Sequence, residues 1–162
     1  MVGVSERNSR ALRTALPAAL TAVGLVLVAV GMFLPWFRSG AVLRDSFQAI
    51  GVITTLGFLD GTALELLLYA WYGVVPAITL SIVLYALGFR VGAATIGAFL
   101  AIVTGTVSGG ATVESGGGGS TLGIAATGPT TTLIGSALAV LGAVGIVVNV
   151  RRGASRIAGG EP

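Results

Sequence analysis

The side chains that could do acid–base chemistry in this sequence are a few carboxylates. The chain contains no His and no Cys, and all nine of its basic residues are Arg. These residue types exclude disulfides, thiol chemistry, haem ligation through His or Cys, and the usual zinc sites. Two carboxylates can act as general acid and base, but no spacing here holds a pair together. We therefore expect no enzyme activity, no catalytic or metal-binding residue and no cofactor. The carboxylates considered are Asp45, Asp60, Glu65 and Glu114.

The charged residues that could instead bind a partner gather around the segment from Phe37 to Thr62. Within it, Leu43, Phe47 and Ile50 recur at helical spacing. This spacing predicts a short amphipathic helix that lies on the outer leaflet or caps the helix bundle. We interpret the segment either as a packed lid or as a docking surface for a partner or ligand. Its candidate interaction residues are Arg38, Arg44, Asp45, Asp60 and Glu65.

Arg44 is expected to pair with Asp60 or Glu65, because the few charges on this side of the protein lie around one loop. Such a pair would hold the amphipathic segment against the mouth of the bundle. Glu65 also has a purely structural interpretation. Thr62 and Glu65 have the spacing of a capping box, and a carboxylate is favoured near a helix N-terminus.

Four apolar stretches alternate with these polar segments and indicate the class of protein. Mean hydropathy is +0.98 and only 9% of the residues are charged, against about 25% in a soluble domain. Because a helix rises about 1.5 Å per residue, each stretch can cross a hydrocarbon core about 30 Å thick. The first is expected to be an uncleaved anchor, since it is too long for a signal peptide and lacks a small-residue cleavage site. We predict one transmembrane domain, 1–162, with spans near 15–36, 63–87, 91–108 and 130–149 and outer loops 37–62 and 109–129.

The arginines predict how these spans are oriented. One side of the membrane would carry seven of them, and the other only Arg38 and Arg44. By the positive-inside rule, this asymmetry places both termini in the cytoplasm of a plasma-membrane protein. Trp36 would then lie near the outer interface, and Tyr69, Trp71 and Tyr72 in the outer half of the second span, a depth that amphipathic rings favour. The seven cytoplasmic arginines are Arg7, Arg10, Arg13, Arg90, Arg151, Arg152 and Arg156.

Small residues at four-residue spacing indicate how the helices pack. In lipid, close backbone approach supplies much of the energy of helix association, so such stripes predict helix interfaces. We interpret them as the interfaces of a tight antiparallel four-helix bundle, with one stripe as an alternative docking face for a partner helix. Pro76 predicts a kink in the second span, Gly88 the end of that helix, and Gly128-Pro129 the start of the last one. The packing candidates are Gly97, Ala101, Gly105, Gly135 and Ala139.

The run Phe-Leu-Pro-Trp-Phe-Arg-Ser-Gly at 33–40 is followed by Arg-Asp-Ser-Phe at 44–47, Leu56-Gly57 and the later Gly128-Pro129. This pattern resembles small four-span membrane proteins of actinobacteria, in which Leu-Pro-Trp ends the first span and the outer loop carries Arg-Ser. The resemblance implies the same layout, with a cytoplasmic N-terminus. It implies no catalytic residue and no named activity.

These observations together favour an all-α integral membrane protein without chemistry of its own. The expected function is that of a structural or accessory subunit that binds other membrane proteins of the cell envelope. A small transporter, channel or lipid-binding component is the alternative, although the polar residues inside the spans are scattered. We expect the lipid bilayer and other membrane proteins as partners. No nucleic-acid partner is expected, because the sequence has no dense basic face, and a homo-oligomer is compatible with the small-residue stripes.

Overall fold

The computed structural model describes residues 2–57, 61–116 and 123–158, and the side chains of these residues except 2–14, 39, 63, 64, 114–116 and 153–158. This part of the chain is mostly helical, in agreement with the predicted all-α class, and it adds three short strands. The elements are α1 (Val2–Phe33), β1 (Phe37–Ser39), β2 (Val42–Arg44), α2 (Ser46–Thr55), α3 (Ala63–Tyr72), α4 (Val74–Ala86), α5 (Arg90–Gly116), β3 (Gly123–Ile124) and α6 (Thr127–Ala158).

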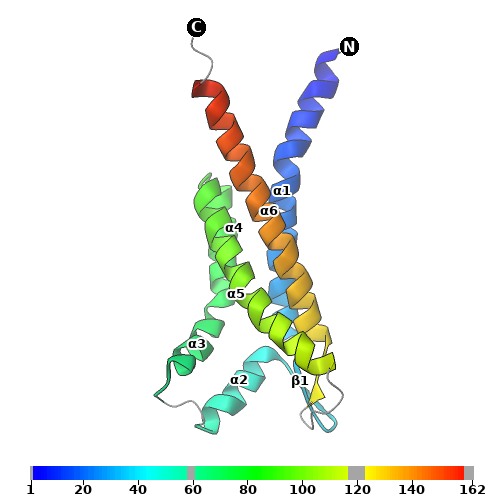
Figure 1. Ribbon diagram of the computed structural model, residues 1–162, viewed down its shortest axis with the longest axis vertical. Coiled ribbons are helices and arrows are strands. Elements are labelled where there is room, and N and C mark those ends of the chain that lie inside the picture. The colour runs from blue at the N-terminus through cyan, green and yellow to red at the C-terminus, as the bar shows by residue number, and fades with distance from the viewer. Residues whose placement is uncertain (1, 58–60, 117–122, 159–162) are drawn as a thin grey trace.

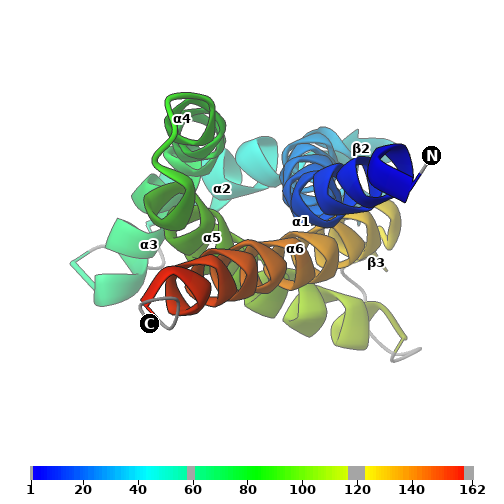
Figure 2. The same ribbon diagram turned by 90° about the horizontal axis from the view of Figure 1, so that it is seen from above.

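The long helices run lengthwise through the molecule, and its two ends differ (Figure 1). Both termini and the turn between α4 and α5 lie at one end, which we call the terminal end. The strands, α2 and α3 lie at the other, which we call the loop end. α6 packs against both α1 and α5, and α4 packs against α5 (Figure 2).

Three helices are long and apolar enough to cross a membrane: Ala15–Phe33 of α1, Arg90–Val113 of α5 and Thr127–Arg152 of α6. α3 and α4 meet the same criteria only as a pair that is bent by 49°. The chain therefore has the character of a membrane protein. The predicted second span, 63–87, is two helices rather than one.

The bend between α3 and α4 lies where the sequence predicted a kink. Gly73 ends α3, and its N–H donates to the carbonyl of Ala70 at 2.9 Å. α4 starts at Val74 and contains Pro76 in its first turn, where the missing N–H of a proline costs little. In an unbroken helix, Pro76 would leave the carbonyl of Tyr72 without its donor. The kink prediction is thus confirmed, with the break three residues before the proline.

The segment after α1 begins with a β-hairpin that the sequence analysis did not predict. β1 pairs antiparallel with both β2 and β3, in the order β2-β1-β3. Gly40 turns the hairpin with a φ of +62°, which glycine adopts without strain. Leu43 therefore belongs to β2, and the predicted amphipathic helix, α2, starts only at Ser46. Asp45 sets this start, because its side chain accepts a hydrogen bond from the N–H of Gln48 at 2.8 Å and so caps the helix.

Two other boundaries differ from those predicted. α1 ends at Phe33, three residues before Trp36, because proline at position 35 disfavours helical backbone in the residue before it. α5 continues to Gly116, so the predicted outer loop 109–129 begins as helix. A Cβ on Gly109 would lie 3.9 Å from Leu133 of α6, an ordinary van der Waals distance. The predicted end of the second span is confirmed: Gly88, with a φ of +92°, follows α4.

α1 and α6 approach each other through glycine. A Cβ on Gly135 would lie 2.7 Å from the carbonyl oxygen of Gly24 and 2.7 Å from the backbone nitrogen of Val28. Ala139, one turn further along α6, is fully buried. The backbones of the two helices are therefore in direct contact, as expected for helices that pack through small residues.

The small-residue stripe of α5 faces the other long helices. A Cβ on Gly97 would lie 3.3 Å from side chains of α1 and α4, and a Cβ on Gly105 would lie 3.0 Å from Ser136 of α6. Ala101, between them, is buried. The hydroxyl oxygens of Thr104 and Ser136 lie 3.1 Å apart and share a hydrogen bond between α5 and α6. This stripe is therefore turned inward rather than toward the surroundings.

Candidate functional site

The Pro35-Trp36 sequence after α1 joins three distant parts of the chain. The N–H of Trp36 donates to the carbonyl of Arg44 at 2.8 Å, and its carbonyl accepts from the N–H of Ala125 at 3.0 Å. The carbonyl of Pro35 accepts from the N–H of Gly128 at 3.0 Å. The indole of Trp36 also lies against Gly128, where a Cβ would overlap the ring. The end of α1, the hairpin and the start of α6 are therefore held together.

Trp36 and Trp71 pack edge to face around a buried serine, an arrangement we call the tryptophan junction. Their ring centroids lie 5.7 Å apart at an interplanar angle of 83°, a favourable geometry for aromatic pairs. The indole N–H of Trp71 donates to Ser46 Oγ at 3.1 Å, and this hydroxyl donates to the carbonyl of Met32 at 2.8 Å. The indole N–H of Trp36 donates to the carbonyl of Gly31 at 2.8 Å. The junction thus connects α3, α2 and the end of α1.

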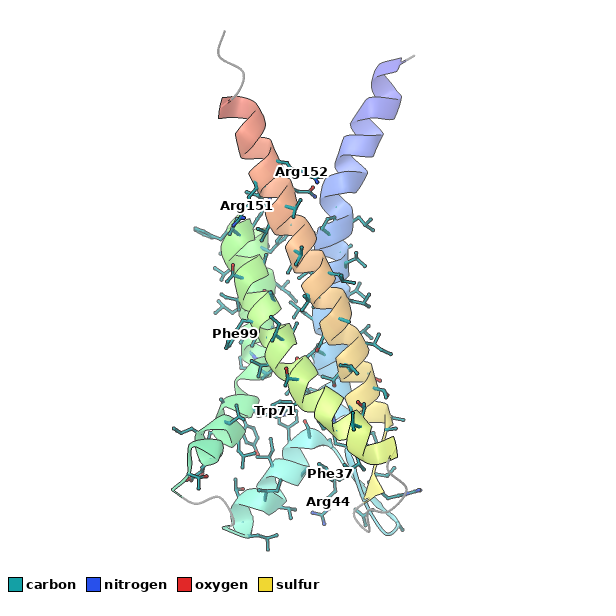
Figure 3. The ribbon with its side chains drawn as sticks, in the orientation of Figure 1. Phe37, Arg44, Trp71, Phe99, Arg151 and Arg152 are labelled. Atoms are coloured by element: carbon teal, nitrogen blue, oxygen red, sulfur yellow. The ribbon has the colours of Figure 1, made fainter. Side chains whose placement is uncertain are left out.

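An apolar groove lies beside the tryptophan junction, between α2, α3 and α5. Its volume is about 210 Å³. Figure 3 shows Trp71 above α2, between α3 and α5, where it borders this space. Leu67 of α3 is 46% exposed at the same groove. The lining residues are Trp36, Phe37, Ser46, Ala49, Ile50, Ile53, Leu67, Leu68, Trp71, Val107 and Ala111.

The apolar groove offers shape and hydrophobic contact rather than a reactive group. None of its lining residues is titratable, and its one hydroxyl, on Ser46, is engaged by Trp71 and Met32. The volume of about 210 Å³ is below the roughly 300–1,000 Å³ of typical small-molecule sites. Aromatic and aliphatic pockets of this kind hold the anchor side chains of protein–protein interfaces. The geometry therefore fits an apolar side chain of a partner better than a small metabolite.

The structure separates the charged residues that the sequence analysis grouped. Asp45 caps α2, and Glu65 accepts a hydrogen bond from the N–H of Gly61 at 2.9 Å, one residue before the position expected for a capping box. Arg44 lies beside the hairpin in Figure 3, with α2 between it and α3. Within the described residues no ion pair joins Arg44 to Glu65, so this alternative of the predicted pairing is not formed. The other alternative, Arg44 with Asp60, lies outside the described residues.

Arg38 lies apart from the other candidates, on β1 opposite Gly123 of β3. It is exposed and borders an open hollow of about 820 Å³ at the start of α6. The hydroxyls of Thr130 and Thr131 at this hollow donate to carbonyls of their own helix. Among the described lining residues, Arg38 therefore meets no second charged group.

The sequence analysis missed the tryptophan junction. The prediction for Trp36 and Trp71 concerned their depth in the membrane and did not include their burial inside the protein, where they are only 4% and 6% exposed. The aromatic residues that are exposed on α3 are Tyr69 and Tyr72. The Leu-Pro-Trp and Gly-Pro sequences of the resemblance carry the two sides of a neighbouring contact, that of Trp36 with Gly128, which is not part of the junction.

No protein-family model, no curated protein and no solved structure matches this chain. The resemblance to four-span proteins of actinobacteria therefore stays a prediction.

Proposed function

We propose that the chain is a plasma-membrane protein with four spans and with both termini in the cytoplasm. α1, α5 and α6 would form three spans, and the bent pair α3–α4 would form the fourth. Both termini lie at the terminal end (Figure 1), as an even number of crossings requires. Arg90, Arg151 and Arg152 lie at the same end, and the positive-inside rule assigns that end to the cytoplasm.

Its function in this proposal is to bind another membrane protein of the cell envelope, as a structural or accessory subunit without catalysis. The apolar groove between α2, α3 and α5 is the observation that carries the proposal. Trp36, Ile50 and Trp71 belong to the buried core as well as to the groove, whereas Leu67 is 46% exposed there and can contact a partner. A non-catalytic role is supported by Asp45 and Glu65, because their carboxylates accept backbone hydrogen bonds at the starts of α2 and α3.

A transporter or channel would need a polar path between the long helices. The described hydroxyls there donate to a carbonyl of their own helix, donate to a carbonyl of a neighbouring helix, as Ser81 does to Ala93, or share a hydrogen bond, as Thr104 and Ser136 do. The cavity between α1, α4, α5 and α6 has a volume of about 50 Å³, which leaves little room for a hydrated solute. A lipid chain, in contrast, could enter the apolar groove, so lipid binding is the alternative that an experiment must separate.

The test places a photo-crosslinking amino acid at Leu67, which lines the apolar groove, or at its neighbour Leu66, which does not. The two side chains are 46% and 73% exposed, so each meets whatever surrounds α3. We expect the Leu67 variant to capture one defined protein in intact cells. The same protein should co-purify at a fixed ratio with the unmodified chain in mild detergent, while the Leu66 variant captures mainly lipid.

A second variant tests whether the partner occupies the groove. Ala111→Trp fills the groove from α5 and should abolish co-purification while the chain still folds, as judged by its elution volume. Unchanged co-purification would show that the partner binds elsewhere. Capture of lipid alone at both positions would contradict the accessory function and support lipid binding.

A further inference from the structure

A further cavity, lined by both polar and apolar side chains, lies at the terminal end of the bundle, between α4, α5 and α6. Its volume is about 100 Å³, well above the roughly 10–15 Å³ that holds one water by this measure. We infer that this cavity binds a phosphate group, supplied in the cell by the headgroup of an anionic phospholipid. Its lining residues are Tyr85, Arg90, Ile146, Asn149 and Val150.

The charge around this cavity is positive. Arg90 starts α5 at the cavity, and Arg151 and Arg152 follow its lining residues on α6 (Figure 3). Asp45 and Glu65 are the carboxylates whose side chains the structure describes, and both belong to the loop end. Within the described residues, no carboxylate neutralises Arg90. An anion that enters the cavity therefore meets the positive charge of Arg90.

The kinds of side chain in the cavity match a phosphate that carries an apolar tail. A guanidinium such as that of Arg90 binds phosphate through two parallel hydrogen bonds. The hydroxyl of Tyr85 can donate to a further oxygen, and Asn149 adds a polar side chain to the lining. Ile146 and Val150 add apolar wall on α6, which suits the glycerol and acyl part of a lipid. A free anion without an apolar tail would contact only the polar residues of the lining and not Ile146 or Val150.

The position of the cavity along α6 fits a headgroup as well. Asn149 and Val150 stand near the end of the apolar segment Thr127–Arg152, which is the depth at which hydrocarbon gives way to headgroups. In the proposed orientation this is the cytoplasmic leaflet, whose anionic lipids attract basic residues close to the surface. The cavity does not require the protein partner proposed above, so the two proposals can be tested independently.

The test uses the full chain, purified in mild detergent, with phosphatidylglycerol, phosphatidylcholine and inorganic phosphate as probes. Bound lipid is counted by native mass spectrometry during titration. We expect phosphatidylglycerol to bind at least about tenfold more tightly than phosphatidylcholine, as one charge-assisted contact predicts. Arg90→Gln should weaken that binding by about tenfold for the same reason. Arg38→Gln removes the same charge at the loop end and should leave the affinity unchanged.

Two further variants distinguish a site with defined hydrogen-bond geometry from nonspecific electrostatic attraction. Arg90→Lys keeps the charge but loses the two-pronged geometry, so it should recover only part of the affinity. If Arg90→Gln does not fold, Arg90→Lys serves as the test variant in its place. Tyr85→Phe removes a single hydroxyl and should weaken phosphatidylglycerol binding without changing the net charge.

Three results would overturn the inference. Equal losses in Arg90→Gln and Arg38→Gln would mean that binding follows net charge alone. Equal affinities for phosphatidylglycerol and phosphatidylcholine would remove the case for an anionic headgroup. Competition by inorganic phosphate at the same concentration as the lipid would assign the cavity to free phosphate instead of a lipid.

Discussion

At the residue scale, the hydroxyl of Ser46 holds the loop end together because it donates and accepts at once. It donates to the carbonyl of Met32 and accepts from the indole of Trp71. Only 4% of Ser46 is exposed, so water cannot replace either bond. Asp45 and Glu65 accept hydrogen bonds at the starts of their own helices, and the neutral junction is one of the described contacts that link α1, α2 and α3.

Ser46→Ala should therefore lower the free energy of unfolding by about 1–3 kcal/mol, because it leaves a buried indole N–H without its acceptor. Thr55→Ala is the matched control, since that exposed hydroxyl bonds only to the carbonyl of Gly51 in its own helix. Denaturation in detergent, followed by tryptophan fluorescence, measures both, and the two tryptophans of the chain are those of the junction. Equal stability of the two variants would show that the junction contributes nothing.

At the scale of elements, the neighbours of each glycine decide which helix contacts tolerate a methyl group. A Cβ at Gly135 meets backbone atoms of α1 at 2.7 Å, which cannot move without separating the helices. A Cβ at Gly97 meets only side-chain atoms, the nearest at 3.3 Å, and these can shift slightly. Gly92 has open space around it. The three positions share glycine and a helical backbone but differ in what surrounds them.

Gly135→Ala should accordingly destabilise the protein by about 1–3 kcal/mol, the usual cost of overpacking. Gly97→Ala should be nearly neutral. Gly92→Ala should stabilise by roughly 0.5–1 kcal/mol, because alanine has the higher helix propensity and nothing obstructs it. Thermal unfolding in detergent ranks the three variants, and any other order would contradict direct backbone contact between α1 and α6.

At the scale of the whole molecule, the bent pair α3–α4 decides how many times the chain crosses the membrane. If the pair is one span, the hairpin and the turn before α5 lie on opposite sides of the membrane. If it is a re-entrant loop, they lie on the same side. The chain has no native cysteine, so single introduced cysteines report these positions without background.

In intact cells, Ala41→Cys in the hairpin should react with an impermeant thiol reagent. Phe89→Cys, in the turn before α5, should react only after the membrane is permeabilised. Both positions are exposed in the folded protein. A difference in labelling between the two cysteines would therefore not result from burial inside the protein. Labelling of both cysteines in intact cells would favour a re-entrant α3–α4, and the reverse pattern would invert the proposed orientation.

Several features of the fold follow from local sequence properties. The apolar segments of α1, α5 and α6 are visible as hydropathy, and the kink before Pro76 follows from its missing N–H. α2 exists where an amphipathic segment was expected, although Asp45 delays its start. The hairpin at 37–44 could not be predicted in this way, because its pairing depends on β3 of a remote segment as well as on β2.

The sequence by itself determined the membrane-protein character, the apolar segments and the helix breaks, because hydropathy, proline and glycine act within a few residues of their position. Only the tertiary structure decided which distant groups meet. Trp71 reaches a serine 25 residues earlier, and Tyr85, Arg90 and Asn149 come from three helices to line one cavity. Hydrogen bonds and cavities depend on distances between such groups, and those distances are set when the helices pack, not by the spacing of residues along the chain.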